Sequence, residues 1–378
     1  MNARFAESPS PASRCAWPRF SQAYCCLARV PFASYDALRL VSRRLRGACG
    51  SEGYARERDR FRESLVVVCG GSDWGYRREA WLLTPDRTWL PRPALPFGRD
   101  AFCLTAARPF GDELYATGGR LRGYEASAAV SAFDARAGKW RDVAPMLEAR
   151  FGHGAAALRP KPKLALVAVA PRRRRPAEQR RISVTQKPLL VVAGGYHDDA
   201  ELASAEALDL VTGRWRAIAP LPFATCYAAA AVVDGCFYVA GGAGPGDGRL
   251  QMWDPATGEW ARRADLPQAR QSAAAVVVAG RLYLIGGLLD LGETASVIRY
   301  CPMSDAWHWG EDARAIPWLP KPRSGATAAL LVDGSVLLVG GGSPLVCRRD
   351  GDGYRAWEDV ADLPIGWVRW PGAATVEL

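Results

Sequence analysis

The sequence predicts an all-β fold, a β-propeller of six blades whose ring is closed by the C-terminal strand. Three observations carry this prediction. A strand-length apolar run ends in paired glycines at six places, a tryptophan follows each pair at a similar distance, and a strand of small residues follows each tryptophan. One such unit cannot bury both faces of its own sheet, whereas six units around an axis can bury all of them.

The first recurring element is the apolar run before each double glycine. These runs are rich in Val, Leu and Tyr, as buried strands are. The six runs are LVVVCGG (to Gly71), LYATGG (to Gly119), LLVVAGG (to Gly195), FYVAGG (to Gly242), LYLIGG (to Gly287) and VLLVGG (to Gly341). Six copies with the same punctuation predict a repeated unit rather than one irregular domain.

A second strand and a turn lie between each double glycine and its tryptophan, most clearly in AFDARAGKW, ALDLVTGRW and MWDPATGEW. Asp opens such a turn by bonding back to the chain, and Gly supplies its left-handed residue. The turns WLLTPDRTW and CRRDGDGYRAW depart from this pattern, so we expect the first and last blades to be less regular. The tryptophans expected to pack between neighbouring sheets are Trp89, Trp140, Trp215, Trp260, Trp307 and Trp357.

A strand of small residues follows each tryptophan and suits the crowded region near the axis. Several of these strands turn into the next apolar run at tight hairpins such as VVDGCFYV. The chain enters the first unit at SLVVVCGG, without a small-residue strand, and ends with an additional one, RWPGAATVEL. We therefore expect the last strand to pair into the first blade and close the ring.

The double glycine and the trailing tryptophan resemble the kelch motif, and the resemblance covers residues 64–378. The chain resembles the kelch domain of Kelch-like (BTB-kelch) proteins, and this resemblance implies a protein-binding propeller without catalysis. By this resemblance the chain is the substrate-recognition propeller of an adaptor for a cullin-RING ubiquitin ligase. The BTB domain that would recruit the ligase has no counterpart in this chain. A free-standing kelch scaffold for cytoskeletal or nuclear partners is the alternative, and a propeller enzyme with a site in the central channel is a third.

Alternate loops of an antiparallel blade go to opposite faces, so the loops after the glycines and before the small-residue strands share one face. Arginine and tyrosine around a shallow opening are typical of binding hot spots, and they suit an acidic peptide. The resemblance implies that the arginines contact the ligand, whereas the alternative is that they brace neighbouring loops through backbone carbonyls. The expected partner-binding residues are Arg99, Arg150, Arg270, Arg323, Arg369, Tyr76, Tyr124 and Tyr196, with Thr225 at the arginine position of blade 3.

Enzymatic chemistry has no positive signal in the sequence. The three histidines, His153, His197 and His308, fall in different blades, so we expect no metal, no cofactor and no enzyme activity. No apolar run is long enough for a membrane span. The ten cysteines lack paired spacing and suggest a reducing compartment, the cytoplasm or the nucleus.

The net charge of +10 is concentrated in residues 1–50 and 158–188, and the remainder is mildly acidic, so nucleic acid is not the expected partner. Residues 1–63 are expected to be a largely disordered leader with a short helix at 35–46. The block with Arg172 to Arg175 explains the one long repeat: double glycines are 45 to 54 residues apart except Gly119 and Gly195, which are 76 apart. We expect residues 159–187 to be a disordered basic insertion in a propeller hairpin, with a nuclear-import or nucleic-acid tail as the alternative.

Overall fold

The computed structural model describes residues 64–378 apart from 73–75, 85–86, 108–111, 136, 162, 170–177, 185, 310–314, 365, 367 and 378. The expectations for residues 1–63 lie outside this part of the chain. Within it the regular structure consists of strands alone, so the described residues contain no helix long and apolar enough to cross a bilayer.

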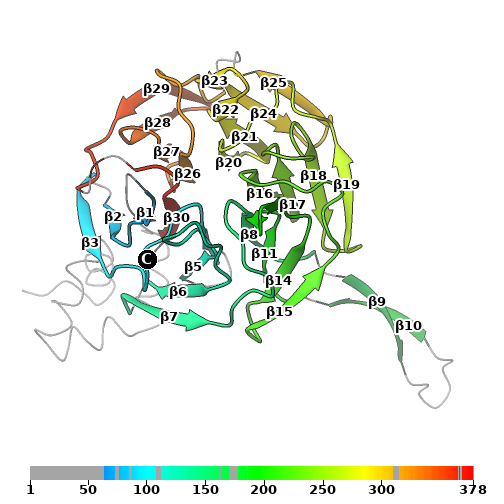
Figure 1. Ribbon diagram of the computed structural model, residues 1–378. Coiled ribbons are helices and arrows are strands. Elements are labelled where there is room, and N and C mark those ends of the chain that lie inside the picture. Colours follow the sequence, from blue (N-terminus) through cyan, green and yellow to red (C-terminus); the bar gives the residue numbers. More distant parts are fainter. Residues whose placement is uncertain are drawn as a thin grey trace, which may run out of the picture. The chain divides into compact units, whose positions relative to one another are not determined.

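Six four-stranded antiparallel sheets form blades 1 to 6 around a common axis (Figure 1). Blade 1 consists of β30 (Gly372–Glu377), β1 (Ser64–Cys69), β2 (Ala80–Leu83) and β3 (Trp89–Arg92). Blade 2 consists of β4 (Cys103–Ala106), β5 (Glu113–Thr117), β6 (Val130–Asp134) and β7 (Lys139–Val143). Blade 3 consists of β8 (Gly154–Leu158), β11 (Leu189–Ala193), β14 (Ala205–Asp209) and β15 (Arg214–Ile218).

The second half of the ring repeats this arrangement. Blade 4 consists of β16 (Ala229–Val233), β17 (Cys236–Ala240), β18 (Leu250–Asp254) and β19 (Glu259–Arg263). Blade 5 consists of β20 (Ala274–Val278), β21 (Arg281–Ile285), β24 (Val297–Cys301) and β25 (Ala306–Trp309). Blade 6 consists of β26 (Thr327–Leu330), β27 (Val336–Val339), β28 (Leu345–Asp350) and β29 (Gly353–Asp359). The predicted six-bladed fold is confirmed.

The ring closes as the sequence predicts, because β30 pairs along its whole length with β1, from Ser64 opposite Glu377 to Cys69 opposite Gly372. In Figure 1 the last strand of the chain lies beside the first strand. Closure removes the two open sheet edges that an unpaired β1 and β30 would present.

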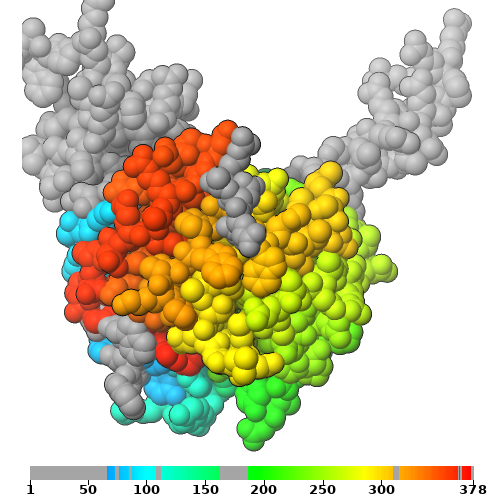
Figure 2. Space-filling model, turned by 90° about the horizontal axis from the view of Figure 1, so that it is seen from above, coloured from blue at the N-terminus to red at the C-terminus, as the bar shows by residue number. Residues whose placement is uncertain are grey.

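Each blade is buried on both faces, which explains the unbroken apolar runs in the sequence. In β11 all five side chains are buried. Leu190 and Val192 pack in the cluster between blades 2 and 3, while Val191 and its neighbours pack in the cluster between blades 3 and 4. Four further clusters of the same kind join the other neighbouring blades. Figure 2 shows the packed outer surface of blades 4 to 6, from yellow-green to red. A fully buried aliphatic side chain contributes about 1.5–3 kcal/mol, so the inter-blade clusters dominate stability.

The inner strands carry small residues because neighbouring blades approach each other most closely at the axis. A Cβ atom added at Gly154 of β8 would lie 2.6 Å from the Cβ atom of Ala230 in β16. The double glycines have a different cause. At Gly118 φ is +59°, and a Cβ atom there would lie 2.4 Å from the carbonyl oxygen of Arg150, so a side chain would be both strained and obstructed.

The tryptophans join the blades in the way that their spacing predicts. The indole N–H of each donates to a backbone carbonyl in the loop that leaves the preceding blade, at 2.7 to 2.9 Å. The six bonds run from Trp89 to Ala361, Trp140 to Pro93, Trp215 to Ala144, Trp260 to Ala219, Trp307 to Ala264 and Trp357 to Pro317. The first of these bonds joins blade 1 to blade 6 and is a second element of closure.

The additional residues of the long repeat before Gly195 lie between β8 and β11 of blade 3. At the equivalent place in blade 4 the two strands are joined by the two-residue turn Asp234–Gly235. The structure differs from the expected absence of regular structure, because β9 (Lys163–Val169) and β10 (Glu178–Val184) form an antiparallel ribbon. These two strands pair with each other and with no blade. Arg172 to Arg175 lie outside the described residues. The expected irregularity of blade 6 is seen as a register shift between Cys347 and Arg349.

Candidate functional site

The arginines expected on the binding face are buried and turned toward the next blade. Arg99, Arg150 and Arg270 have exposed fractions of 0–2%, and Arg323 of 6%. The Nη1 atoms of Arg99, Arg150 and Arg270 donate to the carbonyl of the first glycine of the following blade: Gly118, Gly194 and Gly286. Arg323 donates to the Ser343 carbonyl, and Thr225 Oγ1 donates to the Gly241 carbonyl, so the side chains at these five positions all donate to backbone carbonyls. These contacts are those of the bracing alternative, because a glycine in the left-handed region leaves a carbonyl that needs a donor.

The arginine brace of blade 3 includes a buried counterion. Arg150 Nη2 lies 2.8 Å from Glu206 Oε1, and Glu206 is 2% exposed. The same carboxylate accepts hydrogen bonds from the backbone N–H groups of Leu147 and Glu148. No described carboxylate forms a salt bridge with Arg99 or Arg270, and burial lowers the pKa of each to about 10. Replacing these arginines would therefore cost stability as well as any binding.

Arg369 does not occupy the arginine position in the loop that leads from blade 6 into β30 of blade 1, which corrects the alignment made from the sequence. Strand register places the position four residues before the strand, as in Arg150 before Gly154. Because β30 begins at Gly372, that place belongs to Val368, which is 1% exposed. Arg369 is one residue further along, half-buried, with Nη2 3.3 Å from Glu293 Oε1 of blade 5. The proline loop before it differs in length, so residue type alone suggested the wrong match.

A different arginine organises the exposed face. Arg120 follows the double glycine of blade 2 and holds Asp100 in a bidentate ion pair, with N–O distances of 3.0 and 2.8 Å. Its guanidinium carbon lies 5.1 Å from the ring centre of Tyr124 and 5.6 Å from those of Phe151 and Trp370. The hydrogen bond with Asp100 raises the pKa of Arg120, so its charge is permanent. One ion-paired cation thus lies beside three rings from different loops.

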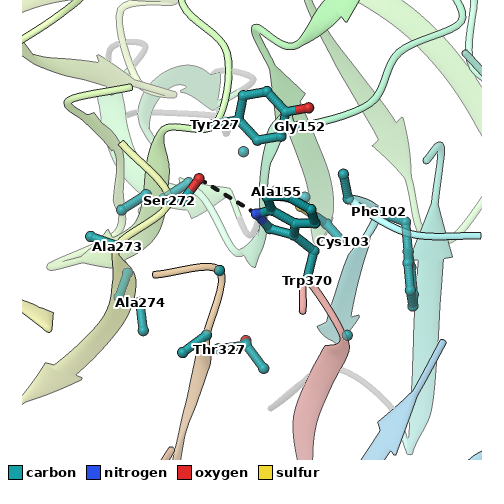
Figure 3. A pocket seen from close by; sticks show the side chains of 18 of the residues that line it. Phe102, Cys103, Gly152, Ala155, Tyr227, Ser272, Ala273, Ala274, Thr327 and Trp370 are labelled. Atoms are coloured by element: carbon teal, nitrogen blue, oxygen red, sulfur yellow. Dashed lines mark hydrogen bonds between the residues drawn. The ribbon is translucent and has the colours of Figure 1, made fainter. Parts of the chain in front are cut away.

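The channel mouth is narrowed by two large side chains at a repeat position otherwise occupied by small residues. This axial position has positive φ in every blade and is occupied by Ala101, Gly152, Tyr227, Ser272, Gly325 and Trp370. Tyr227 and Trp370 face each other across the mouth at 6.0 Å, and the Trp370 indole N–H points to Ser272 Oγ at 3.5 Å (Figure 3). Below them lies a cavity of about 220 Å³ lined mainly by alanine and glycine.

The axial residues are linked by backbone hydrogen bonds from blade to blade. The five links run from the N–H of Gly152 to Ala101, of Tyr227 to Gly152, of Ser272 to Tyr227, of Gly325 to Ser272 and of Trp370 to Gly325, at 2.6 to 3.0 Å. The two glycines also make room for the aromatic rings, since a Cβ atom at Gly325 would lie 3.0 Å from Trp370 and one at Gly152 would lie 3.1 Å from Tyr227. The mouth is therefore rigidly framed.

We call Arg120, Tyr124, Phe151, Tyr196, Tyr227 and Trp370 the aromatic mouth. Of the tyrosines expected from the sequence, Tyr124 and Tyr196 belong to it, and Tyr124 is 74% exposed. Tyr76 lies near Arg120 and Asp100. Desolvation raises the pKa of its phenol, the charge of Arg120 lowers it, and the charge of Asp100 raises it. Sequence reasoning missed Arg120, Phe151, Tyr227 and Trp370. If the six repeats are aligned on the axial position, Tyr227 and Trp370 are the two large side chains among small ones, and this difference in size could have identified them.

The histidines do not converge within the described chain, where no group of three or more His, Cys, Asp or Glu side chains could hold a metal. His153 is buried, with Nε2 2.9 Å from Thr117 Oγ1. Burial and the charges of Arg150 and Arg99 lower its pKa to about 3, so it is neutral at physiological pH. It is a core residue beside the channel.

Comparison with known proteins agrees with this geometry. The model of the Kelch motif matches residues 183–222 and 269–308, which span most of blades 3 and 5. The chain is 29% identical over 290 residues to Kelch-like protein 35 of Mus musculus, covering 73% of this chain and 42% of that protein. It is 30% identical over 226 residues to human Kelch-like protein 33, covering 53% of this chain and 36% of the relative. The chain thus carries kelch repeats and spans less than half the length of either relative.

Proposed function

We propose that this kelch propeller holds a short segment of another protein against its aromatic mouth, as the substrate-recognition part of a BTB-kelch adaptor for a cullin-RING ubiquitin ligase. The mechanism is positioning without chemistry. The observation that carries the proposal is the pre-arranged set of rings around Arg120, of which Tyr124 is 74% exposed. Rigid aromatic side chains and arginine are the residues that contribute most to binding at protein interfaces.

The face is pre-organised, which favours binding. Arg120 is fixed by Asp100, and the axial backbone bonds hold Tyr227 and Trp370. A partner segment would therefore bind without ordering these side chains, and the entropy cost of association would be small on this side of the interface. A catalytic role has less support, because the channel below the mouth is lined mainly by alanine and glycine.

The adaptor part of the proposal is supported by the similarity to two Kelch-like proteins that are more than twice as long as the matched region. In such an adaptor the ligase would be recruited by a BTB region and the substrate by the propeller. A free-standing scaffold in the cytoplasm or nucleus would bind its partner in the same way and would recruit no cullin in any form.

The test is affinity capture from cell lysate with the full chain as bait, followed by mass spectrometry. The wild type is compared with Tyr124→Asn, which removes the ring and suits the left-handed backbone of this residue, where φ is 68°. The matched control is Met303→Ala, which removes a side chain that is 92% exposed in the turn between β24 and β25, on the opposite face. We expect Tyr124→Asn to lose about 90% of the recovered partner, and the control to lose none.

Equal recovery by both variants, with unchanged melting temperatures, would refute binding at the mouth. The adaptor part is tested separately by fusing an N-terminal BTB region to the chain. Recovery of a cullin with the fusion together with the same partner supports the adaptor, whereas absence of ubiquitin transfer to the captured partner by the reconstituted complex argues for the scaffold.

A further inference from the structure

A hollow of about 430 Å³ opens beside the aromatic mouth, between the loops that follow the double glycines of blades 2 and 3. Its walls combine rings and carboxylates. The residues that matter are Tyr124, Glu125, Phe151, Tyr196, Asp198 and Asp199. Of the residues expected from the sequence to recognise an acidic ligand, only Tyr124 and Tyr196 line this hollow.

The two aspartates are held at the rim by a short hairpin. Strands β12 (Tyr196–His197) and β13 (Ala200–Glu201) pair antiparallel, with Asp198 and Asp199 as the two turn residues. Their φ values are 47° and 58°, which is the type I′ geometry that matches the twist of a tight hairpin. The carboxylates therefore stay beside the rings rather than sampling a long mobile loop.

The negative charge of the hollow is not neutralised by the described part of the chain. Asp198 lies 3.2 Å from the His197 ring, and no described lysine or arginine forms a salt bridge with Glu125, Asp198 or Asp199. The phenol of Tyr196 reports this charge, because desolvation and then Asp199 and Glu201 raise its pKa. A carboxylate ligand would be repelled here.

Two rings of the hollow already have a cation close to them. Arg120 of the protein itself lies over Tyr124 and Phe151, and Phe151 and Tyr196 pack at 5.5 Å with a tilt of 48°. The ring faces are electron-rich, so a second cation in the hollow would gain both the quadrupole attraction of the rings and the charge of the rim. A planar guanidinium suits stacked rings and paired carboxylates better than an ammonium group does.

We propose that this hollow binds the side chain of an arginine in the partner segment, as a cation subsite next to the aromatic mouth. The inference rests on the proposed function, since it names one residue that the bound segment must carry. It also alters the ligand expected from the sequence: the segment presents a basic residue over blades 2 and 3, whatever the charge of its other residues.

The subsite can be tested without the natural partner. The full chain labelled with ¹⁵N is titrated with N-acetyl-arginine methylamide and with N-acetyl-citrulline methylamide, a neutral isostere, while amide shifts of Tyr124 and of residues 196–201 are followed by NMR. We expect saturable shifts with the arginine compound and binding about ten-fold weaker with the citrulline compound.

The variant Asp198→Asn/Asp199→Asn keeps the turn, since asparagine tolerates positive φ, and removes two charges. We expect it to weaken binding of the arginine compound about five-fold or more. The matched control Asp247→Asn/Asp290→Asn removes two exposed acids from the loops of blades 4 and 5 on the same face and should change binding less than about two-fold.

Equal binding of the two compounds, an equal loss in the control variant, or absence of shifts in the wild type would each overturn the subsite. These outcomes are distinguishable from failure of the proposed function. If the arginine compound does not bind but Tyr124→Asn still loses its captured partner, only the subsite is refuted. If the compound binds and the capture is insensitive to Tyr124, the binding function of the mouth is refuted instead.

Discussion

Strand β30 and the insertion between β8 and β11 differ in how they contact the propeller. Strand β30 is the shorter segment, but all six of its residues pair with β1, and Ala373 and Ala374 pack in the clusters on either side of blade 1. The insertion is several times longer, yet its strands β9 and β10 pair with each other and with no blade. The contribution of a segment to this fold therefore depends on its contacts with the blades and not on its length.

The largest effect is expected on removing the closing strand. A chain ending at Val368 would leave β1 as an open edge and would uncover the clusters that blade 1 shares with blades 2 and 6. We expect loss of the cooperative melting transition by circular dichroism, and aggregation on size-exclusion chromatography. A truncated chain that melts at the wild-type temperature would refute closure by β30.

An intermediate effect is expected at the second element of closure. Trp89→Phe removes the N–H that donates to Ala361 across the blade 6 to blade 1 joint, while Trp215→Phe removes the equivalent bond at an ordinary joint. Trp89 is 8% exposed and Trp215 is less buried, so we expect losses of about 1–2 and about 1 kcal/mol in the free energy of unfolding. Urea denaturation of both variants measures the difference. A larger loss for Trp215→Phe would mean that the closing bond contributes no more to stability than the bond at an ordinary joint.

The smallest effect is expected on shortening the insertion. Replacing residues 159–188 by Asp-Gly copies the turn of blade 4, where Asp234 and Gly235 have φ values of 52° and 82°. Because β9 and β10 pair with no blade, the free energy of unfolding should change by less than about 1 kcal/mol. A drop comparable to that of the truncation would show that the insertion supports the propeller and would remove the contrast drawn above.

Most of the fold was predictable because its signals are local and repeated. The double glycines mark positions of positive φ, and the tryptophans mark bonds between blades, so each unit carries the evidence within itself. The candidate site was predicted less well. Tyr124 and Tyr196 were expected and belong to the mouth, but Arg99, Arg150, Arg270 and Arg323 point into the blades, because their hydrogen bonds go to the glycine carbonyls and loops of the next blade.

The sequence by itself determined the number of blades, the order of their strands and the closure by the last strand, since all three follow from the period and punctuation of one repeat. Only the tertiary structure decided which side chains meet at the aromatic mouth. Arg120, Phe151, Tyr227 and Trp370 come from different blades, and the register of Val368 and Arg369 depends on how β30 pairs with β1. Such contacts depend on distances between blades, which a repeat pattern along the chain does not contain.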